Sequence, residues 1–297
     1  MRPPPAVRLT AYVLTPAGDD GAVLPELVAP LCARAVEAGV DAVAVLGSTG
    51  GLPYLEDDDR ERVVRAAAEA VAGRVPLVVG AGGMTAPTLR RAAHDAVRWG
   101  ADELLVPLLS YWPLTPPEQR AMYDAVLEGL GVPLTLYRAR ATTTALDLGV
   151  VADLAADERV VALKDTSADV ATWLEHADVL RGRRAVLRHE FSRDALAVDL
   201  VEAGAGGWAS ALAGVFPDRV VGIRDRAGDG PAGRQAARRE LAAFGPLLRL
   251  AAAHGAIRVL AEAMRTIGLP GGAPPAPLLR LEPDARRAVE RALVTLD

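Results

Sequence analysis

The chain has 297 residues, 51% of them hydrophobic and 24% charged, and its formal net charge is −5 at pH 7. This composition predicts a soluble globular protein rather than a disordered chain, and without a basic cluster we expect no nucleic-acid binding. No stretch offers the ~20 apolar residues of a membrane span, and the first ten residues lack an apolar signal core. The single cysteine, Cys32, cannot form an internal disulfide, so we expect a cytoplasmic protein.

Short apolar runs alternate with helical patterns from residue 7 onward. Among the helical patterns, 24–39 closes on a glycine, 57–72 begins acidic and continues with arginines, and Thr85 and Thr115 are expected to begin helices. The runs between them are too short and too rich in β-branched residues for helices, and several are continuously apolar, as buried parallel strands are. The predicted strands are 7–14, 41–48, 76–82, 103–108, 133–139, 160–166, 184–190 and 206–212.

Eight strand–helix units predict an α/β fold, a (β/α)8 TIM barrel over residues 1–227, with a doubly wound open sheet as the alternative. Residues 228–297 show no strand pattern, and we expect them to form a C-terminal helical extension. In such a barrel, function resides at the C-terminal ends of the strands, where the loops converge. The residues at those ends are therefore the candidates for the site.

The second predicted strand runs into GSTGG, residues 47–51. Glycines let the backbone approach a ligand, and N–H groups together with the hydroxyls of Ser48 and Thr49 can hold a carboxylate. We predict Ser48, Thr49 and Gly50 as substrate-binding residues. A tight turn between a strand and a helix without a ligand is the other interpretation of this motif.

The sixth predicted strand ends at Lys164, the only lysine of the chain, since the remaining 32 of the 33 Lys and Arg residues are arginine. Desolvation at a barrel mouth lowers the pKa of an amine, and a free amine can form a Schiff base with a ketone. Arginine stays protonated and cannot do so. An ion pair with Asp165 or a nearby acid is the alternative, but arginine would serve that role at least as well. We therefore predict that Lys164 is a nucleophile.

Tyr137 ends the preceding strand, about 5 Å from Lys164 if the two strands are neighbours. A phenol in that place can transfer protons during imine formation, although it could also be an aromatic lid on the barrel core. Ser210 ends the eighth strand and is a further candidate for substrate binding. The histidines show no metal-ligand spacing, so we expect neither a metal nor a cofactor; they are His94, His176, His189 and His254.

Taken together in this order, several stretches resemble the dihydrodipicolinate synthase / N-acetylneuraminate lyase superfamily of pyruvate-dependent class I aldolases. The resemblance covers nearly the whole chain. It is carried by GSTGG, VPLLSYWPLTPPEQ, the tyrosine of TLYRARATT, the lysine of ALKDTS, GAGGWASALAGVFPD and IRVLAEAMRTIGLPGGAPPAPL.

The resemblance implies roles for particular residues. Lys164 matches the Schiff-base lysine and Tyr137 the proton-relay tyrosine. Ser48 and Thr49 match the hydroxyl pair that binds the keto-acid carboxylate, and Thr49 would also serve catalysis by feeding the relay. Residues 192–194 stand where the family has Gly-x-Asp. Members are commonly homotetramers built from tight dimers, so a homo-oligomer, dimer or tetramer, is expected.

The chain also departs from the family pattern. Gly51 replaces a glutamate, and Arg138 follows the tyrosine where Asn is usual. Thr142 stands where the synthases carry an arginine for the aldehyde substrate. The stretch 107–110 reads PLLS instead of PYYN, although Tyr111 comes one step later. These changes imply a rebuilt pocket for the second substrate.

We therefore expect a class I lyase, aldolase or dehydratase that acts on pyruvate or another small 2-keto acid. Arg138, Arg140 or Arg188 could bind an anionic group of the second substrate, by their charge and their place at strand ends. The alternative is a barrel that has lost catalysis and serves as a ligand-binding or assembly protein.

Overall fold

Eight parallel strands form a closed barrel, paired in chain order, with β1 also paired to β8. The computed structural model describes residues 7–139, 145–181, 187–271 and 273–296. The strands are β1 (Arg8–Tyr12), β2 (Ala42–Val45), β3 (Leu77–Gly80), β4 (Glu103–Pro107), β5 (Leu134–Arg138), β6 (Val160–Asp165), β7 (Arg188–Phe191) and β8 (Gly207–Ser210). The predicted (β/α)8 barrel is confirmed and the open sheet is wrong. The first residues of the seventh predicted strand, 184–186, lie outside the described residues.

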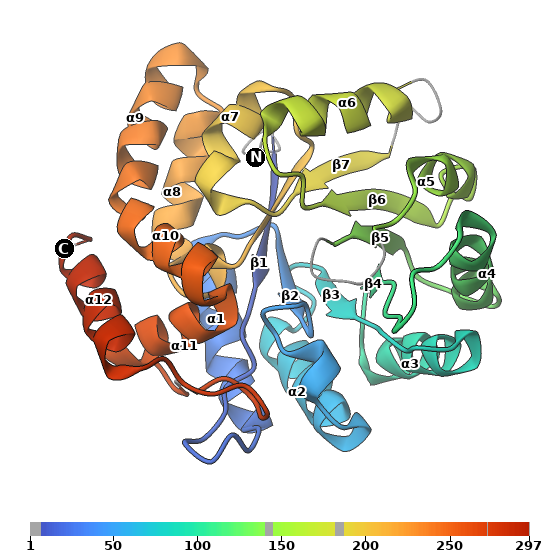
Figure 1. Ribbon diagram of the computed structural model, residues 1–297, viewed down its shortest axis with the longest axis horizontal. Helices are drawn as coiled ribbons and strands as arrows, with labels where there is room; N and C mark the ends of the chain where they lie inside the picture. The colour runs from blue at the N-terminus through green and yellow to red at the C-terminus, as the bar shows by residue number, and fades with distance from the viewer. Residues whose placement is uncertain (1–6, 140–144, 182–186, 272, 297) are drawn as a thin grey trace.

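One helix follows each strand and packs on the outside of the barrel (Figure 1). Thr115 and Glu118 form the predicted capping box at the start of one of them, with the Thr115 N–H donating to Glu118 Oε2 at 2.7 Å. Thr85 and Thr88 cap another in the same way. The eight helices are α1 (Val28–Ala38), α2 (Asp57–Val71), α3 (Ala86–Trp99), α4 (Pro116–Leu127), α5 (Leu148–Leu154), α6 (Val170–Leu180), α7 (Ala197–Glu202) and α8 (Pro217–Ala227).

Side chains alternate along each strand between the helix-covered face and the barrel interior. The interior holds a cluster of small residues, among them Ala42, Ala44 and Ala209, together with the rings of Tyr12 and Tyr137. Because the small residues leave space, two aromatic rings fit inside a barrel of eight strands. That interior is where the candidate site lies.

Four further helices follow the barrel and gather on one side of it, beyond α8 (Figure 1). They are α9 (Gly230–Ala243), α10 (Gly245–His254), α11 (Ala256–Thr266) and α12 (Pro283–Val294). The helical extension is thus confirmed, while the division of the chain at residue 227 stays a prediction. None of the helices in the described ranges is both long and apolar enough to cross a membrane.

The segment between α11 and α12 returns to the barrel rim. Ala273 forms a bridge with Ala17, and the Ala276 N–H donates to the carbonyl of Gly21. Pro275 lies against Gly51, where a Cβ would come within 2.9 Å of its ring. Since these loops follow β1 and β2, the extension reaches the C-terminal rim of the barrel.

Candidate active site

Lys164 and Tyr137 lie side by side on neighbouring strands, as predicted. The register of β5 and β6 pairs Tyr137 with Lys164, and the next pair of strands places Glu190 beside the lysine. Lys164 is only 4% exposed and Tyr137 only 6%. The sequence prediction of their proximity is therefore correct, and the lysine lies within the barrel.

Burial makes the Lys164 amine unusually acidic. Removing the ammonium from water lowers its pKa from 10.5 to about 7, while the nearby carboxylates of Glu190 and Asp194 act in the opposite direction. An ordinary lysine is almost wholly protonated at neutral pH. Lys164 instead has a substantial fraction of free amine, which is the form that attacks a carbonyl.

Two aromatic rings flank the lysine nitrogen. Nζ of Lys164 lies 3.6 Å from the ring centroid of Tyr12 and 4.3 Å from that of Tyr137. Sequence reasoning missed Tyr12, since β1 and β6 are not neighbours and nothing local links the two residues. The signal that could have found Tyr12 is the alternation of side chains along a strand, which places Tyr12 on the inward face of β1 with Thr10 and Arg8.

The Tyr137 hydroxyl lies between two serines. Ser48 Oγ is 3.4 Å from it, and Ser192, in the loop after β7, is its second hydrogen-bond partner. Burial raises the pKa of Tyr137, although both serine contacts act against this shift. The phenol therefore stays protonated at neutral pH and can both donate and accept a hydrogen bond. Sequence reasoning did not single out Ser192 as a partner of the tyrosine.

The GSTGG turn places its hydroxyls at the barrel mouth. Ser48 is exposed and Thr49 is partly buried, whereas Gly50 is buried and its carbonyl accepts a 2.7 Å hydrogen bond from Thr15 Oγ1. A Cβ at Gly50 would lie 2.8 Å from the Leu46 nitrogen, so the tight turn requires glycine there. The turn thus links the mouth to the phenol through Ser48.

Ser210 ends β8, as predicted, and its hydroxyl is hydrogen-bonded within the protein. Its hydroxyl donates to Asp194 Oδ1 at 2.6 Å and accepts from the Ala213 N–H. Trp208 Nε1 and the Leu212 N–H donate to the same carboxylate, and burial raises the pKa of Asp194. Ser210 therefore binds Asp194 within the rim, and this group fixes the loops after β7 and β8 near Lys164.

Two of the arginines proposed for the second substrate, Arg138 and Arg188, do not point into the barrel mouth. Arg138 follows Tyr137 on β5, so strand alternation turns it away from the interior, and its Nε donates to the Leu146 carbonyl at 3.0 Å. Arg188 pairs with both Glu190 and Glu103 in the lower barrel, so its charge is already compensated. Arg140 lies outside the described residues.

A second polar cluster lies behind Lys164, on the outer face of β6. Asp165 Oδ2 contacts Nδ1 of His176 at 2.6 Å and Nε2 of His189 at 3.2 Å, and these contacts lower its pKa against the effect of burial. The alternative ion pair between Lys164 and Asp165 is thus wrong, because the two side chains lie on opposite faces of the strand. Within the described part of the chain, no group of three or more His, Cys, Asp and Glu residues could hold a metal ion.

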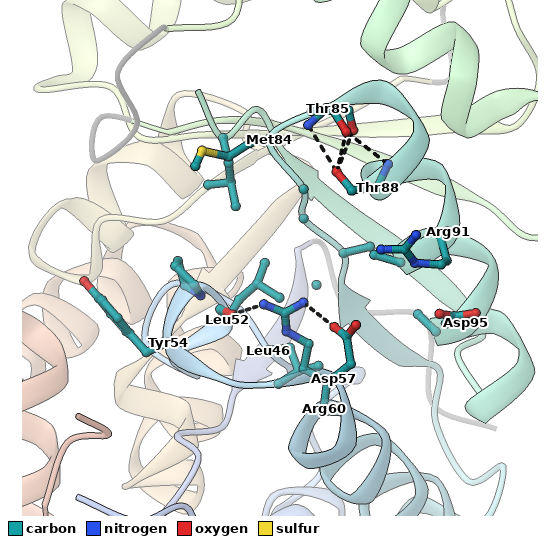
Figure 2. A pocket seen from close by; sticks show the side chains of 18 of the residues that line it. Leu46, Leu52, Tyr54, Asp57, Arg60, Met84, Thr85, Thr88, Arg91 and Asp95 are labelled. Carbon is teal, nitrogen blue, oxygen red and sulfur yellow. Dashed lines mark hydrogen bonds and ion pairs between the residues drawn. The ribbon is translucent and has the colours of Figure 1, made fainter. Parts of the chain in front are cut away.

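A cavity of about 660 Å³ lies outside this site, between α2 and α3. Figure 2 shows Asp57 and Arg60 on one wall and Arg91 and Asp95 on the other. The Arg60 side chain donates a 2.9 Å hydrogen bond to Asp57. Lys164, Tyr137 and Tyr12 do not line this cavity, so its size does not make it the reaction site. The buried, deprotonatable amine places the candidate active site in the barrel.

Comparisons with known proteins agree with this fold. The model of the dihydrodipicolinate synthetase family matches residues 6–296. A Streptomyces coelicolor protein named 4-hydroxy-tetrahydrodipicolinate synthase 1 is 32% identical over 92% of this chain and 88% of its own length. A DapA-like lyase of Halobacterium salinarum is also 32% identical, over 88% and 84%. The crystal structure of dihydrodipicolinate synthase from Agrobacterium tumefaciens matches 98% of both chains at 33% identity, with a TM-score of 0.92.

Proposed function

This chain belongs to the dihydrodipicolinate synthetase family, and on that basis we propose that its reaction proceeds through a Schiff base between Lys164 and pyruvate or another 2-keto acid. The chain is a lyase of the class I type. The observation that carries the proposal is the amine of Lys164, buried beside Tyr137 with a pKa lowered to about 7.

The first stage is the attack of the neutral amine on the ketone carbon. The carbonyl oxygen takes up a proton as the carbinolamine forms, and it then leaves as water when the C=N bond closes. The product is a protonated imine, which withdraws electrons from the adjacent carbon and so permits a C–C or C–O bond to form or break. The Tyr137 hydroxyl, bonded to Ser48, is placed to move these protons.

We propose that Ser48 and Thr49 hold the carboxylate of the 2-keto acid, with backbone N–H groups of the turn through Gly50. The exposed hydroxyl of Ser48 and the glycine-rich backbone support this assignment. We leave Ser210 and Arg138 out of the proposed substrate site, because the Ser210 hydroxyl donates to Asp194 and the Arg138 Nε donates to the Leu146 carbonyl. Thr49 also remains a proposed member of the relay.

The alternative of an inactive barrel receives no support. Relatives that match most of the chain are named lyase or synthase, and the lysine keeps the burial and lowered pKa that imine chemistry needs. Thr142, which stands where the synthases carry an arginine, lies outside the described residues.

We further propose that the chain acts as a homo-oligomer, a dimer or a tetramer, in the cytoplasm. Tyr111 is 81% exposed and Trp112 is 75% exposed, next to each other in the loop after β4. Large apolar side chains exposed together favour burial against another protein surface. Sedimentation velocity of the wild type and of the Trp112→Ser variant tests this proposal. We expect the wild type to sediment as an oligomer, and the variant to dissociate already at a higher protein concentration than the wild type does.

Exchange of the pyruvate methyl protons in D₂O tests the proposed chemistry without knowledge of the second substrate. A protonated imine releases a methyl proton to become an enamine and regains a deuteron from the solvent. We expect the wild type to exchange the methyl protons, and the Lys164→Met variant to leave them at the uncatalysed rate. Equal exchange by folded wild type and folded variant would contradict the role of Lys164.

A further inference from the structure

Tyr12 forms the floor beneath the lysine nitrogen. It comes from β1, which pairs with β2 and β8, so its contact with Lys164 on β6 crosses the barrel interior. Nζ lies over the ring face, 3.6 Å from the centroid, which is well inside the ~6 Å range of cation–π attraction. No family motif quoted for this chain includes Tyr12.

The ring is held in this place by the backbone around it. A Cβ at Gly47 would come within 2.7 Å of Tyr12 Cδ1, so the GSTGG turn presses directly on the ring edge. A Cβ at Gly214 would likewise collide with the carbonyl oxygen of Tyr12. Tyr12 is 3% exposed. The ring therefore cannot turn away from the lysine without displacing the turn proposed to bind the substrate.

The environment makes the ring face an effective partner for a cation. Burial, with Glu190 next in effect, raises the pKa of Tyr12 well above its ordinary value, so the ring is a neutral phenol. The groups around Nζ are Tyr12 from β1, Tyr137 from β5, Glu190 from β7 and Asp194 from the following loop. Because Tyr12 and Lys164 are buried, the attraction of the ring for a positive nitrogen is stronger than at a surface.

We propose that Tyr12 is a catalytic residue of this lyase, whose ring face stabilises the positive charge on the Lys164 nitrogen both as ammonium and as protonated imine. The proposal rests on the Schiff-base function proposed above. The charge is conserved along this path, because an ammonium and a ketone give a protonated imine and water. The neutral amine that attacks the ketone and the neutral carbinolamine that follows it are the forms that the ring does not favour.

A specific pH dependence follows. Below the pKa of the amine, the Lys164 nitrogen is positively charged both before and after imine formation. Weakening its attraction to the Tyr12 ring therefore leaves the imine equilibrium almost unchanged. Above that pKa, the Lys164 nitrogen is neutral before the reaction and charged only in the imine, so weakening its attraction to the Tyr12 ring disfavours the imine. The loss of imine at alkaline pH should equal the fall in proton affinity of the amine, about 2- to 30-fold for the range of cation–π strengths.

The experiment replaces Tyr12 by phenylalanine and then by mono-, di- and trifluorophenylalanine, introduced at this codon alone. Fluorine weakens the negative ring face with little change of volume. Because Lys164 is the only lysine, protein labelled with lysine carrying ¹³C at Cε gives one lysine resonance, whose shift with pH reports the pKa of the free enzyme. Imine formation is measured in parallel by titration with pyruvate below and above that pKa.

We expect Tyr12→Phe to behave like the wild type, and the lysine pKa to fall stepwise with each fluorine, with imine lost only at alkaline pH. A lysine pKa that stays constant across the fluorinated series, while the wild type forms an imine normally, would overturn the role of Tyr12 alone. If the wild type forms no imine, the proposed function fails and this role with it, whatever the titration of the free amine shows.

Discussion

At the scale of single residues, the reactivity of the site follows from where one amine is placed. Lys164 lies among aromatic rings and small side chains, so its ammonium is poorly solvated and its pKa falls to about 7. Arginine in the same place would remain charged. The proposed chemistry therefore requires the one lysine of the chain, and Tyr137 beside it is proposed to supply the proton path.

Replacing Tyr137 by phenylalanine should separate proton transfer from imine stability. The variant keeps the ring beside Nζ but loses the hydroxyl bonded to Ser48. We expect pyruvate methyl exchange to slow by about 10²- to 10⁴-fold, the usual contribution of a placed acid–base group. Trapped imine at equilibrium should change far less, and an equal loss of both would show a structural role instead.

At the scale of elements, the turn after β2 depends on glycine at more than one position. Gly51 has a φ of 75° and lies against Pro275 of the segment between α11 and α12. A side chain there would be strained and would push this segment off the rim. The glutamate that the family pattern leads one to expect is therefore incompatible with this local packing.

The Gly51→Ala variant should be destabilised by more than backbone strain alone. Strain at positive φ costs about 1–2 kcal/mol, and displacing a packed ring adds about 1–3 kcal/mol. Gly73→Ala is the matched control, because Gly73 has a φ of 68° and a methyl group added there would meet no atom within 4 Å. Urea unfolding measures both, and equal losses would show that the Pro275 contact is unimportant.

The elements themselves could largely be predicted, because their signals are local. Strand runs, the capping pairs at Thr85 and Thr115, and the adjacency of Tyr137 and Lys164 all follow from periodicity and from parallel pairing in order. Tyr12 could not be assigned in this way, because its contact spans the barrel between strands that do not pair. Partners of this kind depend on the size of every inward side chain.

The surroundings of Arg138 and Arg188 likewise depend on the folded barrel and not on local sequence signals. A strand end can direct a side chain to either face, and a single residue of register decides between the mouth and the helix layer. Arg138 ends β5 on the outer face, whereas Arg188 begins β7, at the end of the barrel away from the mouth, and pairs there with Glu103 and Glu190. The positive charge near the strand ends predicted an anion site, but the sequence pattern alone does not reveal the groups that these arginines contact.

At the scale of the whole molecule, the reactive amine lowers the stability of the fold. The pKa of Lys164 is about 7 when folded and 10.5 for the unperturbed group, so the unfolded chain binds more protons between these pH values. The free energy of unfolding therefore rises with pH across this window. The penalty is complete below pH 7 and vanishes above the unfolded pKa.

The Lys164→Met variant should accordingly be more stable than the wild type near pH 6, by an amount on the order of a few kcal/mol. The difference should shrink as the pH rises from about 7 toward 10.5. Chemical unfolding of both proteins at one protein concentration over this range measures it, and taking the difference removes contributions from titrating groups that do not interact with Lys164. A difference independent of pH would contradict the lowered pKa.

Lys164 is proposed to form a Schiff base with a 2-keto acid. The most direct measurement is reduction with borohydride in the presence of pyruvate, followed by intact mass and peptide mapping. We predict one reduced adduct on the peptide that contains Lys164, and none there in the Lys164→Met protein. If folded wild type gives no adduct at Lys164 with pyruvate or with a panel of 2-keto acids, this claim is contradicted.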